Sequence, residues 1–147
     1  MSAEAVAETP ATPPPTAYGS PIGINDALGL IQRGIELSRA RGLKMAIAVV
    51  EPSGELVAFA RMDDVPYGSI GVAQQKARTS ARFRMTTASA EERVQNGRLA
   101  LLSAGEFIAI GGGVPIVANG KVIGALGASG ATAAEDAALA SAIVAPR

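Results

Sequence analysis

The sequence predicts an α+β fold in which helices flank an antiparallel sheet within a single domain. Residues 45–62 contain two extended apolar runs joined by Pro-Ser-Gly, and residues 115–128 contain two more joined by Asn119-Gly120. Both linkers have the composition of tight hairpin turns. A helical pattern over residues 69–83 lies between the hairpins. Hairpin-joined strands with helices grouped between them favour antiparallel layers over a doubly wound parallel sheet.

Composition narrows the chemistry that the chain can perform. Its 147 residues are the length of one ordinary domain, and the 13 basic and 13 acidic side chains cancel. This balance argues against nucleic acid or an anionic membrane as a partner. The chain has no cysteine and no histidine. Disulfides, Ser-His-Asp catalysis and the usual zinc sites are therefore excluded.

The first 21 residues have the composition of a tail. Glu4 and Glu8 stand where a secretory signal would be basic, and four prolines follow, at positions 10, 13, 14 and 15. We expect residues 1–21 to be disordered or draped over the surface, with an oligomer-clasping arm as the alternative. Residues 22–147 form the predicted domain, and a cytoplasmic location is the expectation.

The first predicted helix starts with Asn25 as its N-cap and ends before Gly42. Its apolar positions recur every three to four residues, as in Leu28, Ile31 and Ile35. The two strands of the first hairpin follow, at residues 45–50 and 56–62.

The predicted helix over residues 69–83 combines an apolar stripe with several basic side chains. Ile70, Ala73, Ala77 and Ala81 form a narrow apolar stripe suited to close packing. The same segment is basic, with Lys76, Arg78, Arg82 and Arg84.

Less regular structure is expected between this helix and the second hairpin. Ser89 and Glu92 match a capping box, and Gly97 interrupts the helix that they begin. Residues 107–110 are predicted to be extended, and Gly111 to Gly113 to break the strand.

The chain ends with a returning strand and a helix. Gly124 and Gly127 are expected to let a helix pack closely on the strand over residues 121–128. Thr132 and Glu135 form a second capping box, which starts a last helix through Ala142.

Three blocks in order carry a family resemblance: AIAVVEPSGELVAFARMD, then GSIGVAQQKARTS, then GGGVPIVANGKVIGALGASGATAAED. Over residues 24–142 the chain resembles the GlcG/HbpS haem-binding-like family, which includes the C-terminal domain of PduO-type proteins. The resemblance implies a profilin-like fold, homo-oligomers from dimers to octamers, and a small pocket near the glycine block. Family roles in haem handling and in small-molecule catabolism are both implied.

The basic helix favours a site for a small anionic organic molecule. Arg78 and Arg82 can bind a carboxylate with paired hydrogen bonds, and Lys76, which matches a lysine of the family, can serve as a general acid or base. Asp63 is a candidate base after the second strand. The predicted catalytic residues are Lys76, Arg78 and Asp63, with Arg82 binding the ligand. Tautomerisation, deamination or hydrolysis of a ring-cleavage acid is the expected reaction, although a basic helix face that is simply solvated remains an alternative.

Backbone amides are the second predicted ligand-binding feature. Gly111, Gly112 and Gly113 can turn amide groups toward one point, and Ser129 and Gly130 precede a helix N-terminus. A ligand carboxylate or a haem propionate is expected there.

The alternative function is non-catalytic binding or handling of haem or another tetrapyrrole. Without histidine, iron ligation falls to the tyrosines, methionines, lysines or carboxylates, of which the candidates are Tyr18, Tyr67, Met45, Met62, Met85 and Lys76. Each has a simpler role in packing or at the surface. The expectation is that no cofactor is required, that haem is possible, and that no residues have the spacing of a metal site.

Overall fold

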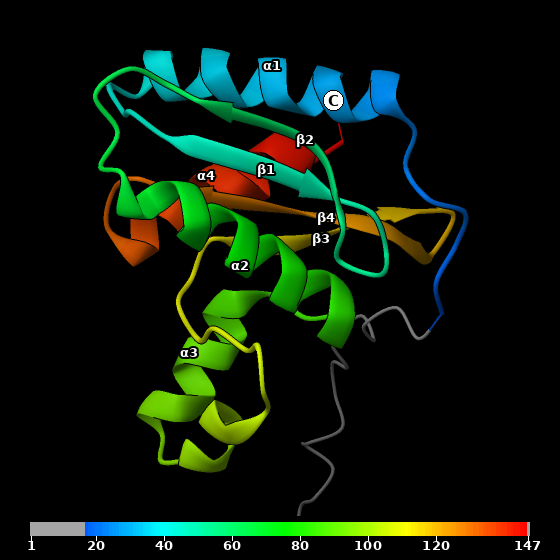
Figure 1. Ribbon diagram of the computed structural model, residues 1–147, viewed down its shortest axis with the longest axis vertical. Helices are drawn as coiled ribbons and strands as arrows, with labels where there is room; N and C mark the ends of the chain where they lie inside the picture. Colours follow the sequence, from blue (N-terminus) through cyan, green and yellow to red (C-terminus); the bar gives the residue numbers. More distant parts are fainter. Residues whose placement is uncertain (1–16, 147) are drawn as a thin grey trace, which may run out of the picture.

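The computed structural model describes residues 17–146, which form four α-helices, a short 3-10 helix and four strands (Figure 1). The helices are α1 (Ile24–Ala40), α2 (Gly68–Phe83), α3 (Thr87–Gln95), η2 (Leu99–Ser103) and α4 (Ala133–Val144). The strands are β1 (Ala46–Val50), β2 (Leu56–Arg61), β3 (Gly113–Ala118) and β4 (Lys121–Ser129). The predicted α+β class is confirmed.

The four strands form one antiparallel sheet in the order β2-β1-β4-β3. β1 is central, and its first residue, Ala46, lies between Arg61 of β2 and Ser129 of β4. Both predicted hairpins are present. Asn119 and Gly120 have φ angles of 53° and 74°, the left-handed pair expected of a type I′ turn.

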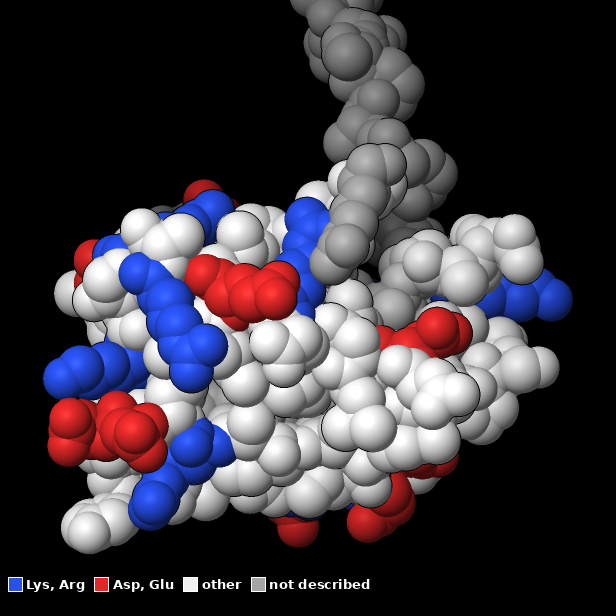
Figure 2. Space-filling model, turned by 90° about the horizontal axis from the view of Figure 1, so that it is seen from above, with Lys and Arg blue, Asp and Glu red and all other residues white. Residues whose placement is uncertain are grey.

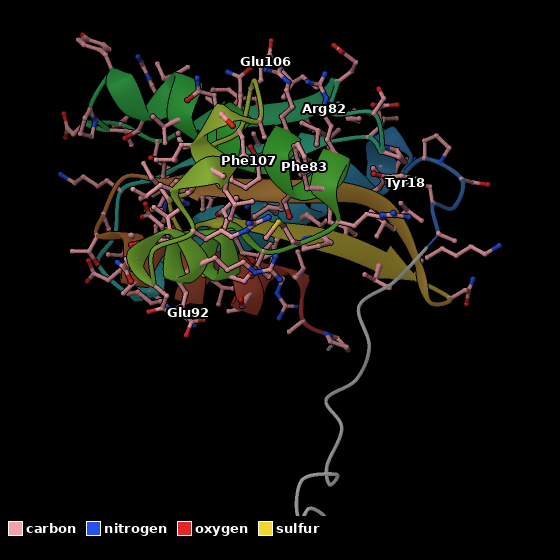
Figure 3. All side chains as sticks on the ribbon, turned by 90° about the horizontal axis from the view of Figure 1, so that it is seen from below. Tyr18, Arg82, Phe83, Glu92, Glu106 and Phe107 are labelled. Carbon is pink, nitrogen blue, oxygen red and sulfur yellow. The ribbon has the colours of Figure 1, made fainter. Side chains whose placement is uncertain are left out.

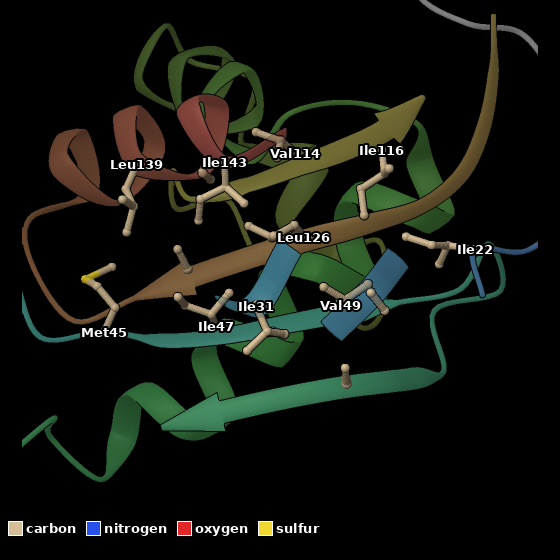
Figure 4. Close-up of a cluster of buried hydrophobic side chains, with 14 residues drawn as sticks. Ile22, Ile31, Met45, Ile47, Val49, Val114, Ile116, Leu126, Leu139 and Ile143 are labelled. Carbon is tan, nitrogen blue, oxygen red and sulfur yellow. The ribbon is translucent and has the colours of Figure 1, made fainter. Parts of the chain in front are cut away.

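The sheet is covered on both faces, giving three layers (Figure 1). Ile47 and Val49 of β1 point toward α1 and α4, in a cluster completed by Ile31, Leu126 and Ile143 (Figure 4). The intervening residues of β1, among them Ala46 and Ala48, point to the opposite face and contact α2. All five residues of β1 are buried, as a strand between two covered faces requires.

Small residues bring α2 unusually close to the sheet. Ala73, Ala77 and Ala81 are fully buried, and a Cβ on Gly127 of β4 would overlap the carbonyl oxygen of Ala73. The packing predicted for Gly127 is thus present. Gly124 was also expected to make room for a helix, but this is not its role. A Cβ on Gly124 would approach the carbonyl oxygen of Val50 in the neighbouring strand β1, and it would contact no helix.

The segment before α1 is part of the sheet's edge. Gly19 donates to the carbonyl of Val122, and the hydroxyl of Tyr18 donates to the carbonyl of Ala81 at 2.7 Å, at the end of α2. Residues 17–21, which the sequence assigned to the tail, therefore contact the folded domain. Residues 1–16 of the predicted tail lie outside the described residues.

Two predicted helix starts are wrong. α1 has Gly23 at its N-cap position, and Asn25 lies inside the first turn, because hydrogen bonding of Ile22 to β4 fixes the chain's entry into the helix. α3 is capped by Thr86, whose side chain accepts from the amide of Ser89, so Ser89 is the third helical residue and not the cap. The capping box of Thr132 and Glu135 on α4 is confirmed.

Residues 107–110 do not form the strand that was predicted. They cross α2 outside the sheet, and the amide of Ile108 donates to the hydroxyl of Thr79 at 3.1 Å. The amide of Ile108 is thus bonded to a side chain of α2, where a strand would be bonded to the backbone of a neighbouring strand. β3 begins only at Gly113.

On the face shown in Figure 2, side chains of both charges lie close together on one side, and the rest of the face is mainly uncharged. No helix within residues 17–146 is both long and apolar enough to span a membrane.

Two glycine-to-alanine changes test the close contact of α2 with β4. Gly127→Ala forces α2 away from the sheet and is expected to lower the free energy of unfolding by at least about 2 kcal/mol. At Gly29 on α1 an added Cβ would lie in open space. Gly29→Ala should therefore raise the free energy of unfolding by about 0.5–1 kcal/mol, because alanine favours the helix more than glycine does. Urea unfolding measures both. Equal effects of the two changes would contradict the packing described.

Candidate functional site

Lys76 lies inside the protein and forms an ion pair with Asp136. The Nζ atom is 2.9 Å from Asp136 Oδ2 and 3.1 Å from the carbonyl oxygen of Ala128, and the two side chains are 1% and 3% exposed. The other carboxylate oxygen of Asp136 accepts from the amide of Ala131. Both charges are therefore paired, and the pair joins α2 to α4 across the end of β4.

The glycine block lies against this pair. Gly112 has a φ of +136° and sits so close to Lys76 that a Cβ would be 2.7 Å from Nζ. The amide of Gly111 donates to Glu91 Oε1 and that of Gly113 to Thr87 Oγ1, both at 2.7 Å. The amides of Gly111 and Gly113, which the sequence assigned to a ligand, thus have acceptors on α3.

Ser129 and Gly130 are also packed into the domain. Ser129 ends β4 opposite Ala46, and a Cβ on Gly130 would overlap the carbonyl of Lys44. The structure therefore brings Lys76, the glycine block and the end of β4 together, as a closely packed junction of α2, α3 and α4.

Asp63 lies apart from the other predicted catalytic residues. It follows the end of β2, whereas Arg78 contacts the turn at the beginning of that strand. At about 3.3 Å per residue, the six residues of β2 separate these two ends by roughly 20 Å. Lys76, Arg78 and Asp63 consequently do not form one site in this structure.

Arg78 and Arg82 are the accessible part of the basic helix. Arg82 Nε donates to the carbonyl of Ser53 at 2.8 Å, and Arg78 Nε donates to that of Gly54 at 3.4 Å. The turn between β1 and β2 thus orients both guanidinium groups. Within this turn the hydroxyl of Ser53 donates to the carboxylate of Glu51, and this hydrogen bond lowers the pKa of Glu51.

Two carboxylates face these arginines. Glu106 Oε1 is 3.2 Å from Nη1 of Arg82 and 3.8 Å from Nη1 of Arg78, and Glu55 Oε2 is 3.8 Å from Nη2 of Arg82. Both carboxylates are mostly exposed, with 74% and 72% of their side-chain surface in solvent. Water weakens such pairs, so a ligand that makes further contacts can displace these carboxylates from the arginines.

A pocket of about 390 Å³ opens beside Arg78, between α2 and the segment before the glycine block. It combines charged, amide and apolar groups, and its lining consists of Gln75, Arg78, Gly105, Glu106, Phe107 and Ile108. The ring of Phe107 meets that of Phe83 edge to face, with centroids 4.9 Å apart. Figure 3 shows Arg82 near Glu106 and Phe83 near Phe107. The pocket suits an apolar body carrying a carboxylate.

Of the six residues that line the pocket, only Arg78 was among the predicted site residues. Phe107 and Ile108 were assigned to a strand, and Gln75 had no signal beyond its place on α2. The only usable signal for Gln75 was its position three residues before Arg78, which places the two side chains on one face of the helix.

Four of the six candidate iron ligands have other roles in the structure. The Tyr18 hydroxyl is bonded to backbone carbonyls, Met45 is fully buried, and Met62 Sδ accepts from the amide of Met45. Lys76 is paired with Asp136. Glu106 is the one acidic side chain of the 390 Å³ pocket. No cluster of three or more potential metal ligands of the types His, Cys, Asp and Glu occurs within the part of the chain that the structure describes.

Residues 22–145 match the family described as haem degrading protein HbpS-like. The chain belongs to this family. It is 41% identical over 103 residues to protein GlcG of Escherichia coli K12, covering 70% of this chain and 77% of GlcG. An uncharacterised 15.0 kDa protein of Citrobacter freundii is 36% identical over 96 residues, covering 63% and 68%. The resemblance seen in the sequence is confirmed.

Several solved structures have the same fold. The ORFY protein of Klebsiella pneumoniae superposes with a TM-score of 0.79 at 25% identity, covering 91% of this chain and 95% of that one. A PduOC–haem complex gives 0.76 at 24% identity over 84% and 93%. HbpS gives 0.79 at 20% identity over 94% and 100%. One of these neighbours is therefore described as a complex with haem.

The buried pair can be tested against an exposed one. Lys76→Met leaves the buried carboxyl group of Asp136 without its partner, and is expected to lower the free energy of unfolding by about 3–5 kcal/mol. Lys44→Met removes the exposed ion pair in which Lys44 Nζ lies 3.4 Å from Asp64 Oδ2. It should change the free energy of unfolding by less than about 1 kcal/mol.

Urea unfolding compares these variants. Adding Asp136→Leu to Lys76→Met should restore part of the loss, because no carboxyl group is then buried without its partner. If Lys76→Met were as mild as Lys44→Met, the structural role given to the pair would be wrong.

Proposed function

We propose that the protein binds an amphipathic organic anion, with haem or a related tetrapyrrole as the first candidate, at the pocket beside Arg78. The observation that carries this proposal is that Arg78 lines the same pocket as the apolar side chains of Phe107 and Ile108, with Arg82 held beside it by Glu106. Arg78 and Arg82 offer charge-assisted hydrogen bonds to carboxylates, and Phe107 and Ile108 offer apolar surface. A tetrapyrrole with propionate groups has both features.

The surroundings of the pocket extend this apolar surface. Phe83 is 43% exposed, and its ring contacts that of Phe107. Exposed aromatic side chains at a pocket rim are typical of ligand or protein contacts. Membership of the HbpS-like family and the fold shared with the PduOC–haem complex support a tetrapyrrole as the occupant.

The residues fit the macrocycle and its propionates better than they fit the iron. The chain has no histidine, and the pocket offers iron only the carboxylate of Glu106 and the amide of Gln75. Binding would therefore rest on Arg78, Arg82 and Phe107, and would be nearly independent of the metal. Haem held here would supply the redox chemistry of its iron.

A porphyrin titration tests this function. We expect metal-free protoporphyrin IX and haemin to bind with dissociation constants within about threefold of each other, because neither depends on a strong axial ligand. Arg78→Ala should raise both dissociation constants by about tenfold or more, because a hydrogen bond to a charged group usually contributes at least that much to affinity. Porphyrin fluorescence and the Soret absorbance are the readouts.

Arg39→Ala is the matched control, since it removes the same charge from the exposed end of α1, on the other face of the sheet. It should leave both dissociation constants unchanged. Absence of saturable binding, or equal binding by Arg78→Ala and the unaltered protein, would overturn the proposal.

A second candidate is a small carboxylate-bearing acid that the protein binds and transforms. The volume of about 390 Å³ favours it, because it lies at the lower end of the range for ligand pockets and would enclose a small molecule more completely than a macrocycle. Gln75 and Arg78 would orient the carboxylate. Among the pocket residues, Glu106 is the group able to accept a proton, in place of the predicted Lys76 and Asp63.

Ring-cleavage acids such as 2-hydroxymuconate test the second candidate. Tautomerisation should change their ultraviolet absorbance, at a rate that Arg78→Ala lowers by about tenfold or more. Asp63→Asn should leave that rate unchanged, because Asp63 lies at the other end of β2. An unchanged absorbance over hours at micromolar protein would exclude this activity.

A further inference from the structure

Glu106 occupies the place that a ligand carboxylate would take. Its Oε1 atom lies within 3.2 Å of Arg82 and 3.8 Å of Arg78, and Glu106 is itself part of the pocket wall. Figure 3 shows its side chain beside Arg82, on the segment that leads to Phe107. The site therefore contains its own carboxylate.

A tethered carboxylate competes with free ones on unequal terms. Because Glu106 is part of the same chain, its effective concentration at the arginines is of millimolar order or higher. A small acid such as acetate gains nothing beyond the hydrogen bonds that Glu106 already makes. A carboxylate on an apolar body also buries surface against Phe107 and Ile108, which offsets the cost of displacing Glu106.

We propose that Glu106 determines specificity as an internal competitor: it reserves Arg78 and Arg82 for carboxylates carried on an aromatic or macrocyclic body and excludes small aliphatic acids. The inference rests on the first function proposed for this pocket, the binding of an amphipathic anion, and excludes the second, which requires a small acid to bind. It adds the ligand class that the site accepts and the residue that enforces the choice.

Glu55 provides a matched control. It also pairs with Arg82, at 3.8 Å, and is similarly exposed, but it does not line the 390 Å³ pocket. Glu55→Gln therefore removes the same charge from the neighbourhood of Arg82 without removing the competitor. Glu106→Gln keeps the size of the side chain and removes its negative charge.

The first experiment titrates protoporphyrin IX into the three proteins at fixed ionic strength, with sodium chloride replaced stepwise by sodium acetate. Glu106→Gln is expected to bind the porphyrin about threefold or more tightly, and acetate should raise its apparent dissociation constant. In the unaltered protein and in Glu55→Gln, acetate should have no more effect than chloride. Equal behaviour of the two variants would overturn the inference, since a general charge effect would then explain both.

A second measurement needs no porphyrin. Sodium acetate at fixed ionic strength should raise the melting temperature of Glu106→Gln, and should not raise that of the unaltered protein or of Glu55→Gln. If acetate left the melting temperature of Glu106→Gln unchanged, the competitor role would be wrong even if porphyrin binds. If porphyrin failed to bind while acetate stabilised Glu106→Gln selectively, the tetrapyrrole would be wrong and the competitor role would stand.

Discussion

The close contact of α2 with the sheet fixes the rest of the molecule. Ala73, Ala77 and Ala81 let the helix approach β4 until the carbonyl of Ala73 faces Gly127. At that distance the neighbouring Lys76 is enclosed, and Asp136 of α4 neutralises it. Arg78 and Arg82 point away from the sheet, toward the turn between β1 and β2. One helix thus supplies the packing stripe, the buried ion pair and the basic groups of the candidate site.

Local patterns predicted the two hairpins and the start of α4, because a hairpin turn and a capping box are short-range features. Asn119-Gly120 forms the expected hairpin turn, and Thr132 and Glu135 form the expected capping box. The candidate site was harder to predict, since its geometry depends on contacts between residues that are far apart in the sequence. Lys76 was predicted to face a ligand, but its partner Asp136 lies 60 residues further along the chain.

The glycine block illustrates the same limit. The sequence correctly marked a sharp bend, but it gave no means of knowing that Glu91 and Thr87 of α3 accept the hydrogen bonds of Gly111 and Gly113. The tertiary structure moves the candidate site from those amides to Arg78 and Phe107. Within the HbpS-like family, this chain combines the shared fold with a pocket that contains arginine and no histidine. A ligand held by its carboxylates and its apolar body fits that combination.

The account depends on where the ligand binds, and arginine side-chain NMR locates it most directly. On addition of protoporphyrin IX, we expect the Nε–Hε signals of Arg78 and Arg82 to shift, while those of Arg39 and Arg41 on the α1 side stay in place. Backbone amides of residues 105–108 should shift with them. Shifts confined to Gly111, Gly113 and Gly130 would contradict the account and would return the site to the glycine block.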